Sequence, residues 1–331
     1  MDRQIYSDRR LALLRPHVRK RRTLDDVPTF IFSCGGDPTY HPARTRLKDY
    51  IASSKNPCFR NVYCVNAENM ADMPEFSKKN LLIQEAMIID ASDCVILFAE
   101  SVGSWCELGA FSALPTVYPI LTVAYDKAHG KDKSFLMKGP IAMVRQHETD
   151  LAKAIGVDLN CPTATPEFTR FLASIKSAAR GSARKQINTS YKEINLGGYV
   201  HELLDLVNYF APILKDDVEV LYRSLKGFPR KNRLNIVSPT ITESIKDSKA
   251  ISRDIDTEQV LAFMRSSQMI AASEDPYDRV WLNPIIRPEH SFMFRDVNKR
   301  TFVNAQASIL LAKRRKGILG ATDVYHRFDV K

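Results

Sequence analysis

The sequence DCVILFAESVGSWCELGAF, residues 93–111, places a strand, a short loop and a helix in immediate succession. Residues 95–98 are a continuous apolar run, which is typical of a strand covered on both faces. A polar loop with one glycine follows at residues 100–104, and apolar residues then recur at helical spacing. The pattern therefore predicts a buried strand whose carboxyl end leads into a helix that carries Glu107 near its start.

The position of Glu107 allows two interpretations. In an open α/β sheet, ligands bind beyond the carboxyl ends of the strands, where backbone N–H groups and helix N-termini favour phosphate. A carboxylate at that place could act on a bound ligand. The alternative is a surface glutamate on an ordinary strand–helix connection, and residues 93–111 alone do not separate the two.

Further strands and helices alternate along the chain around this segment. Strands are expected at residues 29–34, 61–65 and 119–125, and helices at residues 41–54 and 80–90. Strands that alternate with helices predict an α/β fold, in which a parallel sheet has helices on both faces.

A glycine turn follows the first expected strand. Gly35, Gly36 and Asp37 form a sharp turn in which the backbone can approach a ligand closely. Because the strands are expected to be parallel, this turn and the loop at residues 100–104 should lie at the same edge of the sheet. The glycines are too few for a dinucleotide-binding fingerprint, and the sequence contains no P-loop.

Length and composition limit the kind of protein. With 331 residues, 44% of them hydrophobic and 26% charged, the chain can form two globular domains. No apolar stretch approaches the roughly 20 residues of a membrane span, and the charged N-terminus lacks a signal-peptide core. The six cysteines include no C-x-x-C pair, which favours reduced thiols over zinc or disulfides. We therefore expect a cytoplasmic protein without a metal or membrane contact, in which Cys106 packs rather than reacts.

The net charge of +10 is partly concentrated in two basic runs. The first contains Arg19, Lys20, Arg21 and Arg22, and the second contains Lys313, Arg314, Arg315 and Lys316. Such runs are most often solvated surface or flexible tails, but local positive charge is also what attracts phosphate. Both runs are therefore candidate contacts with nucleic acid or a partner, and charge alone does not decide between these alternatives.

The C-terminal part has the element order of a winged helix. Helices are expected at residues 199–214, 215–226 and 256–269, and the last begins with a capping box formed by Asp256 and Gln259. A β-hairpin is expected to follow, and in winged-helix proteins the helix before the hairpin often enters a nucleic-acid groove. The alternative is a small packing or dimerisation domain, because the apolar residues of the helix at 256–269 are typical of a buried core and leave few residues to contact nucleic acid.

Two motifs resemble a known family. CGGD at residues 34–37 and FAESVGSWCELGAF at residues 98–111 are similar to the effector proteins of bacterial retrons. The resemblance is to the type that combines a Rossmann-like domain, similar to nucleoside 2-deoxyribosyltransferases, with a C-terminal winged-helix domain. It covers residues 29–144 well and the second domain weakly, with Glu85 and residues 203–209 among the supporting matches.

The resemblance and the composition of the flanking segments together divide the chain into five expected parts. They are a basic N-terminal arm at 1–26, a deoxyribosyltransferase-like catalytic domain at 27–180, a linker at 181–198, a winged-helix-like domain at 199–298, and a basic tail at 299–331 that is expected to be partly ordered at best.

The resemblance implies a toxic effector in antiviral defence. Its reaction would be hydrolysis of an N-glycosidic bond, most simply of NAD to nicotinamide and ADP-ribose. NAD would then be the substrate, and no cofactor is expected. The partners would be a reverse transcriptase and its msDNA, a branched RNA–DNA product, which restrain the toxin until phage infection. Nucleic acid would be contacted through this complex, and formation of a homo-oligomer is left open.

The resemblance also assigns roles to residues. Glu107 matches the catalytic glutamate of the family, and it could stabilise or attack the oxocarbenium-like cation that forms as the bond breaks. Glu85 is a candidate second acid, and Asp37 could hold a ribose hydroxyl or orient water. The candidate substrate-binding residues in the two loops are Gly35, Gly36, Glu100, Ser101, Gly103 and Ser104.

One position departs from the typical transferases, which carry an aspartate six residues before the catalytic glutamate. This chain has Ser101 there, which favours hydrolysis over base exchange. Nicotinamide is already cationic in NAD, so it can leave without a general acid. Two alternatives remain: a glycosidase or deoxyribosyltransferase that acts on nucleotides or nucleic-acid bases, and a non-enzymatic nucleic-acid-binding regulator.

Overall fold

The computed structural model describes residues 5–21, 27–66, 70, 73–76, 80–180, 186–244, 255–288 and 290–318. The chain forms two compact units. The first, here called the sheet unit, comprises Pro28–Arg184 and Ser238–Arg253, and the second, the helical unit, comprises Met1–Val27, Lys185–Val237 and Asp254–Lys331. Among the described residues, no helix is both long and apolar enough to cross a membrane.

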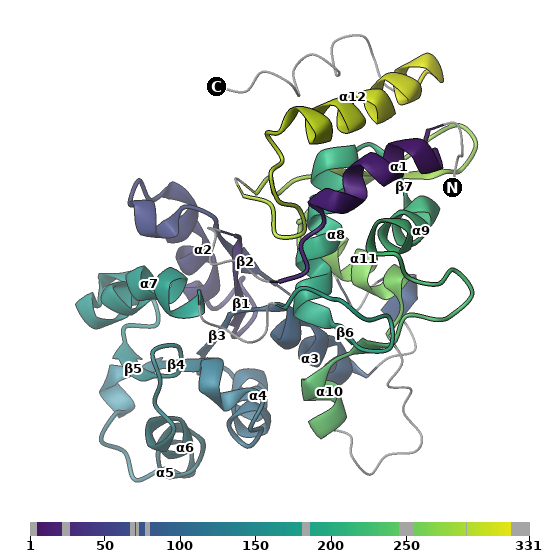
Figure 1. The fold of residues 1–331 in the computed structure, drawn as a ribbon. Helices are drawn as coiled ribbons and strands as arrows, with labels where there is room; N and C mark the ends of the chain where they lie inside the picture. The colour runs from purple at the N-terminus through teal and green to yellow at the C-terminus, as the bar shows by residue number, and fades with distance from the viewer. Residues whose placement is uncertain are drawn as a thin grey trace. The chain divides into compact units, whose positions relative to one another are not determined.

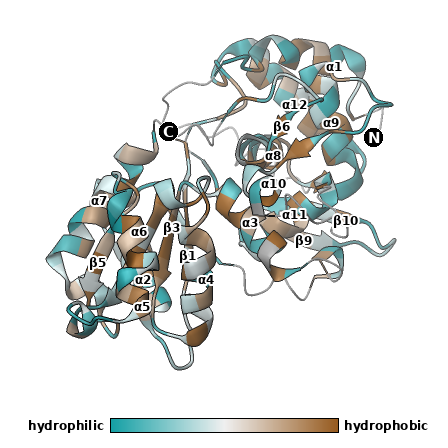
Figure 2. Ribbon diagram, turned by 90° about the horizontal axis from the view of Figure 1, so that it is seen from below, coloured by the Kyte–Doolittle hydropathy of each residue, from teal (hydrophilic) through white to brown (hydrophobic). Residues whose placement is uncertain are grey.

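The sheet unit is built on five parallel strands in the order β2-β1-β3-β4-β5. The strands are β1 (Thr29–Cys34), β2 (Val62–Val65), β3 (Cys94–Phe98), β4 (Leu121–Asp126) and β5 (Ala154–Val157). Every residue of β1 and β3 is buried, as the continuous apolar runs predicted, and Figure 2 shows the hydrophobic character of these strands. The expected α/β class with a parallel sheet is confirmed.

Helices cover the sheet on two sides. They are α2 (Ala43–Ser53), α3 (Leu81–Ala91), α4 (Val102–Ser112), α5 (Phe135–Lys138), α6 (Pro140–Gln146), α7 (Pro166–Ala179) and α10 (Pro239–Ser244). Figure 1 shows α2 and α7 on one side of the sheet and α4 and α6 on the other. This follows from right-handed crossovers, because the step from β1 to β2 runs in the opposite direction to the steps from β3 onward.

The strand order reverses direction between β1 and β3. The chain leaves β1 toward β2 on one side, whereas β3 and the later strands lie on the other. In doubly wound sheets, ligands bind beyond the carboxyl ends of the strands at such a reversal. The segments that follow Cys34 and Phe98 therefore flank the expected site.

A segment far along the sequence completes the sheet unit. Asp90, in the last turn of α3, accepts hydrogen bonds from the Ser238 hydroxyl, from Thr240 N at 3.0 Å and from Thr240 Oγ1 at 2.6 Å. Glu243 accepts hydrogen bonds from Thr116 N at 3.0 Å and Thr116 Oγ1 at 2.5 Å. These bonds attach α10 to the unit, although more than 50 residues of the helical unit separate it from Arg184 in sequence.

The helical unit surrounds a central buried helix. Its helices are α1 (Asp8–Leu14), α8 (Leu196–Phe210), α9 (Lys215–Lys226), α11 (Thr257–Ser266) and α12 (Arg300–Arg315). Its strands are β6 (Ile194–Asn195), β7 (Ile213–Leu214), β8 (Ile236–Val237), β9 (Ile270–Glu274) and β10 (Val280–Pro284). Helix α8 is buried along most of its length and contacts α9, α12 and β10.

The expected order of three helices and a hairpin is confirmed in this unit. Helices α8, α9 and α11 precede the antiparallel pair β9–β10, and β7 joins that pair as a third strand. The Asp256–Gln259 capping box at the start of α11 is also present. The finer winged-helix and deoxyribosyltransferase-like assignments stay predictions.

The two ends of the chain contribute helices to the helical unit. Helix α1 packs against α12, and Arg10 Nε donates a hydrogen bond to Ser308 Oγ at 2.7 Å. Within the tail expected from residue 299, Phe302 and Ile309 are fully buried. The described part of this tail is therefore a packed helix, with residues 319–331 outside the description.

Candidate active site

The two loops predicted to form the site meet at the carboxyl edge of the sheet. Gly36 N, after β1, donates a hydrogen bond to Glu100 Oε1, after β3, at 3.1 Å. A Cβ atom at Gly35 would lie 2.7 Å from Glu100 Oε1, and one at Gly36 would lie 2.2 Å from Cδ2 of His41. A side chain at Gly35 would displace the Glu100 carboxylate, and one at Gly36 would displace the His41 ring or the turn. The expectation that the loops share one edge is confirmed.

Ser101 and Ser104 form the start of α4. Ser101 Oγ accepts a hydrogen bond from Ser104 N at 3.2 Å. Ser104 Oγ accepts from Ser101 N at 3.0 Å and from Glu100 N at 3.1 Å. This reciprocal capping box was not predicted, because serine takes the place of the usual glutamate at its third helical position. Ser104 is buried and holds the loop, so a role as a ligand donor would have to compete with these bonds.

Gly103 lies in the first turn of α4 on an open surface. The nearest atom to a Cβ built there is Ser101 Oγ at 3.9 Å. Unlike Gly35 and Gly36, this glycine is not required by packing, and the N-terminal face of α4 is accessible at this point. Its proposed contact with substrate stays a prediction.

Glu85 and Glu107 face each other from α3 and α4. The two side chains are hydrogen-bonded, and the pKa of Glu85 is raised to about 8 by burial first, then by the charge of Glu107 and by this hydrogen bond. Burial also raises the pKa of Glu107, while the charge of Arg44 and the hydrogen bond from Glu85 act to lower it. The two carboxyl groups therefore titrate as a pair, and Glu85, which donates the shared hydrogen bond, keeps its proton to the higher pH.

The carboxylate of Glu107 has unused hydrogen-bonding capacity. Its Oε2 atom is buried and has no hydrogen-bond partner among the described residues. A buried polar atom without a partner is costly in a folded protein and commonly marks a functional position. The Oε2 atom of Glu107 therefore retains the capacity to accept a hydrogen bond, and the catalytic role of this residue stays a prediction.

Arg44 is a member of the site that the sequence did not reveal. It lies in the first turn of α2, and its Nη2 atom donates a hydrogen bond to Gly36 O at 2.6 Å. Its positive charge lowers the pKa values of Glu100 and Glu107, opposing the effect of burial. In the sequence, an arginine in the first turn of a helix after a glycine turn is only a weak indication of a site residue. The fold is what brings Arg44 close to Glu100 and Glu107.

Cys34 and Asp37 complete the surroundings of the acids. The Cys34 thiol is buried, and its pKa is raised by burial first and then by Glu107 and Glu85, so it is protonated and unreactive. Asp37 is exposed, and its Oδ1 accepts a hydrogen bond from Thr39 N at 2.8 Å, which lowers its pKa. Asp37 therefore stays ionised and cannot act as a proton donor near neutral pH.

The predicted basic contacts lie in the helical unit. Lys20, Arg21, Arg314, Arg315 and Lys316 are exposed, and Arg19 is partly exposed. Arg22 lies outside the described residues. Lys313 differs from its neighbours: its side chain is fully buried, and its ammonium donates hydrogen bonds to Phe210 O and to Pro212 O, the latter at 2.7 Å. It anchors α12 instead of presenting its charge to a partner.

Comparisons with known proteins agree on one family. The family model of the STM3845 retron effector protein matches residues 41–270. A retron Ec86 protein of Escherichia coli, named as a candidate ribosyltransferase/DNA-binding protein, is 29% identical over 223 residues, which cover 60% of this chain and 71% of that protein. The corresponding retron Ec73 protein of Escherichia coli is 27% identical over 143 residues, which cover 42% of this chain and 45% of that protein.

Proposed function

Because the chain belongs to the STM3845 retron effector family, we propose that it is the toxic component of an antiviral retron and that its sheet unit is an N-glycosidase. We further propose NAD as the substrate, with nicotinamide and ADP-ribose as products. A reverse transcriptase and its msDNA would restrain the activity. The names of the two relatives, which include ribosyltransferase and DNA-binding, support both parts of this proposal.

The observation that carries the enzymatic proposal is the Glu85–Glu107 pair. Cleavage of the bond between C1′ of the ribose and the pyridinium nitrogen sends the bonding electrons to nicotinamide and leaves positive charge on the sugar. A carboxylate fixed beside C1′ lowers this barrier by stabilising the cation or by forming a covalent intermediate. Water then adds to C1′ and releases one proton. The Oε2 atom of Glu107 is buried and has no hydrogen-bond partner within the described part of the chain.

The proton on Glu85 has a positioning role in this scheme. It keeps Glu107 as the ionised member of the pair and holds it in one orientation. Nicotinamide departs as a neutral base, so the reaction does not require this proton. The arrangement therefore suits a cationic leaving group, and Ser101, at the position where typical transferases have an aspartate, supports the same preference.

The turn at Gly35 and Gly36 and the start of α4 would receive the rest of the substrate. Both lie at the reversal of strand order, where backbone N–H groups and a helix N-terminus favour phosphate. The pyrophosphate of NAD matches this environment, and Asp37, as an ionised side chain at the rim, could accept a hydrogen bond from a ribose hydroxyl.

The test is release of a free base by the purified protein without its partners. We expect nicotinamide and ADP-ribose to appear by mass spectrometry when NAD is supplied, and Glu107→Gln to reduce the rate at least 100-fold with the melting temperature retained. Cys106→Ser, an exposed neighbour on α4, is the matched control and should keep the wild-type rate. If wild-type protein leaves NAD intact, the NAD proposal fails.

A nucleotide, nucleoside or nucleic-acid base is the second candidate substrate, because the relatives are named as ribosyltransferases. The same assay with a panel of nucleotides and DNA oligonucleotides distinguishes it, since the mass of the free base identifies the substrate. A non-enzymatic regulator would instead leave toxicity in cells unchanged by Glu107→Gln.

A further inference from the structure

We propose that Arg44 is a positioning residue of the candidate active site, and that its charge makes Glu107, and not Glu85, the ionised member of the acid pair. The two carboxyl groups are chemically identical, so the difference between them must come from their surroundings. Because both acids belong to the site of the proposed glycosidase, the kinetic consequences of this role rest on that activity. Its electrostatic consequences can be measured without turnover.

The side chain of Arg44 is held in place by the turn that follows β1. Its Nη2 atom donates a hydrogen bond to Gly36 O at 2.6 Å. A Cβ atom at Gly35 would lie 3.3 Å from both Cγ and Cδ of Arg44, so the aliphatic stem packs against the backbone there. Gly36 N in turn donates to Glu100 Oε1 at 3.1 Å. The turn therefore binds the cation through its carbonyl and an acid through its amide, and the backbone fixes where the guanidinium lies.

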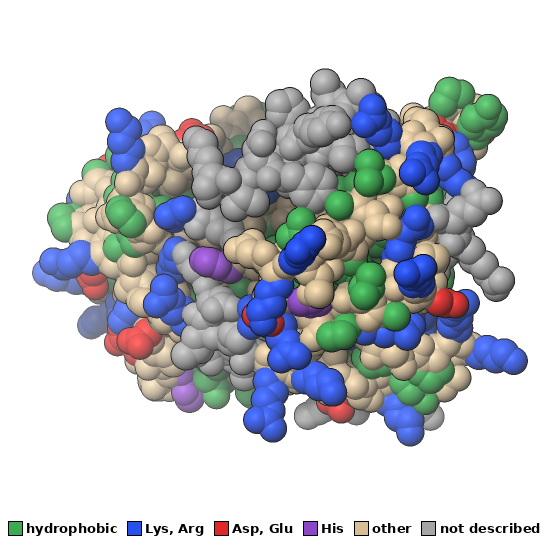
Figure 3. Space-filling view, turned by 45° about the horizontal axis from the view of Figure 1, so that its top comes forward, with side chains coloured by type: hydrophobic (Ala, Val, Ile, Leu, Met, Phe, Trp, Pro, Cys, Tyr) green, Lys and Arg blue, Asp and Glu red, His purple; other side chains and the backbone are tan. Residues whose placement is uncertain are grey.

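Burial distinguishes Arg44 from the basic side chains on the surface. Figure 3 shows Lys and Arg side chains, in blue, extending from one face of the molecule. Arg46, two positions further along α2, is exposed in the same way. Arg44 is half-buried, and its Nε atom is buried. A charge acts more strongly on its neighbours where water is excluded, because the effective dielectric constant is lower there.

The charge of Arg44 acts on the two acids unequally. The pKa of Glu107 is raised by burial and lowered by Arg44, whereas burial, the charge of Glu107 and the shared hydrogen bond all raise the pKa of Glu85. The buried Cys34 thiol is influenced by both acids and by Arg44, which places the three groups around the end of β1. The proton of the pair goes to the carboxyl group whose anion is less stabilised, so Glu85 keeps it.

Other ionisable groups at this edge are Glu100, Asp37 and His41. Burial raises the pKa of Glu100, while the Gly36 amide, His41 and Arg44 act to lower it. Asp37 is exposed, and its pKa is lowered by its hydrogen bonds with Thr39 and, to a smaller extent, by the charges of Arg44 and His41. The groups that act on Glu107 are Arg44 and Glu85. The titration of Glu107 should therefore respond to Arg44 first.

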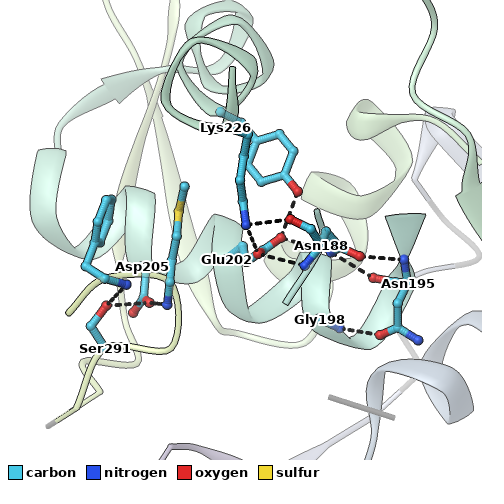
Figure 4. Close-up of polar contacts among 10 residues, drawn as sticks. Asn188, Asn195, Gly198, Glu202, Asp205, Lys226 and Ser291 are labelled. Atoms are coloured by element: carbon cyan, nitrogen blue, oxygen red, sulfur yellow. Dashed lines mark hydrogen bonds and ion pairs between the residues drawn. The ribbon is translucent and has the colours of Figure 1, made fainter. Parts of the chain in front are cut away.

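A buried carboxylate of the helical unit shows a different arrangement. Glu202 of α8 forms an ion pair with Lys226 through Oε1 and accepts a hydrogen bond from Tyr222 Oη through Oε2 at 2.7 Å (Figure 4). Both of its oxygens are engaged, so its charge has a structural role. The Oε2 atom of Glu107, in contrast, has no hydrogen-bond partner among the described residues. A cation such as Arg44, which acts through its charge, can stabilise this carboxylate without occupying that oxygen.

The test compares Arg44→Gln and Arg44→Lys with Arg46→Gln, a control that removes the same charge from an exposed position of α2. The carboxyl ¹³C resonances of Glu85 and Glu107, assigned from the Gln variant of each, are followed by NMR as the pH is varied. We expect Arg44→Gln to raise the titration midpoint of Glu107 by about one pH unit or more and to bring it closer to that of Glu85. Arg44→Lys keeps the charge, so it should shift the midpoint by less than half as much, and Arg46→Gln should leave it unchanged.

The pH profile of base release gives the kinetic readout. In Arg44→Gln, the acidic limb of kcat/KM should move to higher pH, and the rate on that limb should fall about tenfold for each pH unit of the shift. Arg44→Lys should largely restore the limb, and Arg46→Gln should keep the wild-type profile. A loss by the same factor at every pH that lysine does not rescue would give Arg44 a purely structural role and overturn the proposal.

The NMR titration separates the role of Arg44 from the activity itself. If wild-type protein releases no base and the midpoint of Glu107 still depends on Arg44, the proposed activity is wrong and the role of Arg44 stands. If base is released but the midpoint is the same in Arg44→Gln and in wild type, the role of Arg44 is refuted alone. An equal shift in Arg46→Gln would also refute it, because net charge would then be the cause.

Discussion

Glu85 and Glu107 share a hydrogen bond between neighbouring helices of the sheet unit, and Glu85 is its proton donor. Two carboxyl groups in contact and partly shielded from water cannot both ionise cheaply, so they titrate as a pair. The group with the lower pKa can act as an anion while its partner stays neutral. This division of roles leads to predictions for both activity and stability.

Activity should depend on pH through both members of the pair. It should rise with pH as Glu107 ionises and fall near pH 8, where Glu85 loses the proton that orients Glu107. The measurement is kcat/KM for base release between pH 4 and pH 10. In Glu85→Gln, the amide keeps a donor at this position at every pH, so the alkaline fall should disappear while the acidic limb remains. An unchanged alkaline limb in this variant would assign that fall to another group.

Folding stability should also respond to Glu85. Its pKa in the folded protein, about 8, lies above its ordinary value of 4.5, so the folded state binds more protons between these pH values. The free energy of unfolding should therefore decrease as pH rises through this window, by up to about 5 kcal/mol at about 1.4 kcal/mol per pH unit. Urea denaturation at pH 5 and pH 8.5 should show that Glu85→Gln gains stability over wild type at the higher pH. If the difference in free energy of unfolding between Glu85→Gln and wild type were the same at both pH values, the prediction would be wrong.

The turn at Gly36 should not tolerate a side chain. In Gly36→Ala, the new methyl would meet His41 Cδ2 at 2.2 Å, so either the His41 side chain or the turn must move, and movement of the turn would distort the Gly36–Glu100 hydrogen bond. We expect a loss of about 1–3 kcal/mol in stability and at least a tenfold loss in activity. Gly109→Ala is the control, because nothing lies within 4 Å of its Cβ on α4, and it should stabilise by about 0.5–1 kcal/mol. Similar melting temperatures for the two variants would refute the packing argument.

The attachment of α10 should depend on the charge of Asp90. This buried carboxylate accepts hydrogen bonds from Ser238 and Thr240, and hydrogen bonds to charged groups contribute about 1.5–3 kcal/mol each. Asp90→Asn should therefore expose residues 238–244 to faster amide hydrogen exchange, measured by mass spectrometry. Thr116→Val removes the hydroxyl that donates to Glu243 and accepts from Thr240 Oγ1 at 3.3 Å, but it leaves both Asp90 and the bond from Thr116 N to Glu243 in place, so it should have a smaller effect on the same peptide. Unchanged exchange in Asp90→Asn would mean that apolar packing alone holds α10.

The features that could be predicted from the sequence are those that depend on local residue patterns. The apolar runs of β1 and β3 and the helical spacing after Glu100 are contiguous signals, and they located the strands, the two loops and Glu107. Strand β5 was not predicted, because its four residues include a glycine and give no clear alternation. The conformation of β5 is determined by its parallel pairing with β4, which is a contact between segments distant in sequence.

The remaining features depend on tertiary contacts. Arg44 acts on the acids because α2 is packed beside β1 and β3, and no motif marks it. The raised pKa of Glu85 depends on burial between helices, which a sequence does not give. Lys313 belongs to a run of four basic residues, yet its position on the inner face of α12 takes it into the core. The charge pattern could not distinguish it from its three exposed neighbours.

Helix α10 belongs to the sheet unit but follows residues 185–237 of the helical unit in sequence, which has a consequence for folding during translation. Helix α3 carries both Glu85 and Asp90, and the donors for Asp90 come from residues 238 and 240. During synthesis, these donors are translated only after more than two thirds of the chain (237 of 331 residues). A nascent chain that ends before this point, or a gene truncated after residue 184, would leave the Asp90 carboxylate without those donors. Completion of the sheet unit is thereby tied to translation of the residues of the helical unit that precede α10.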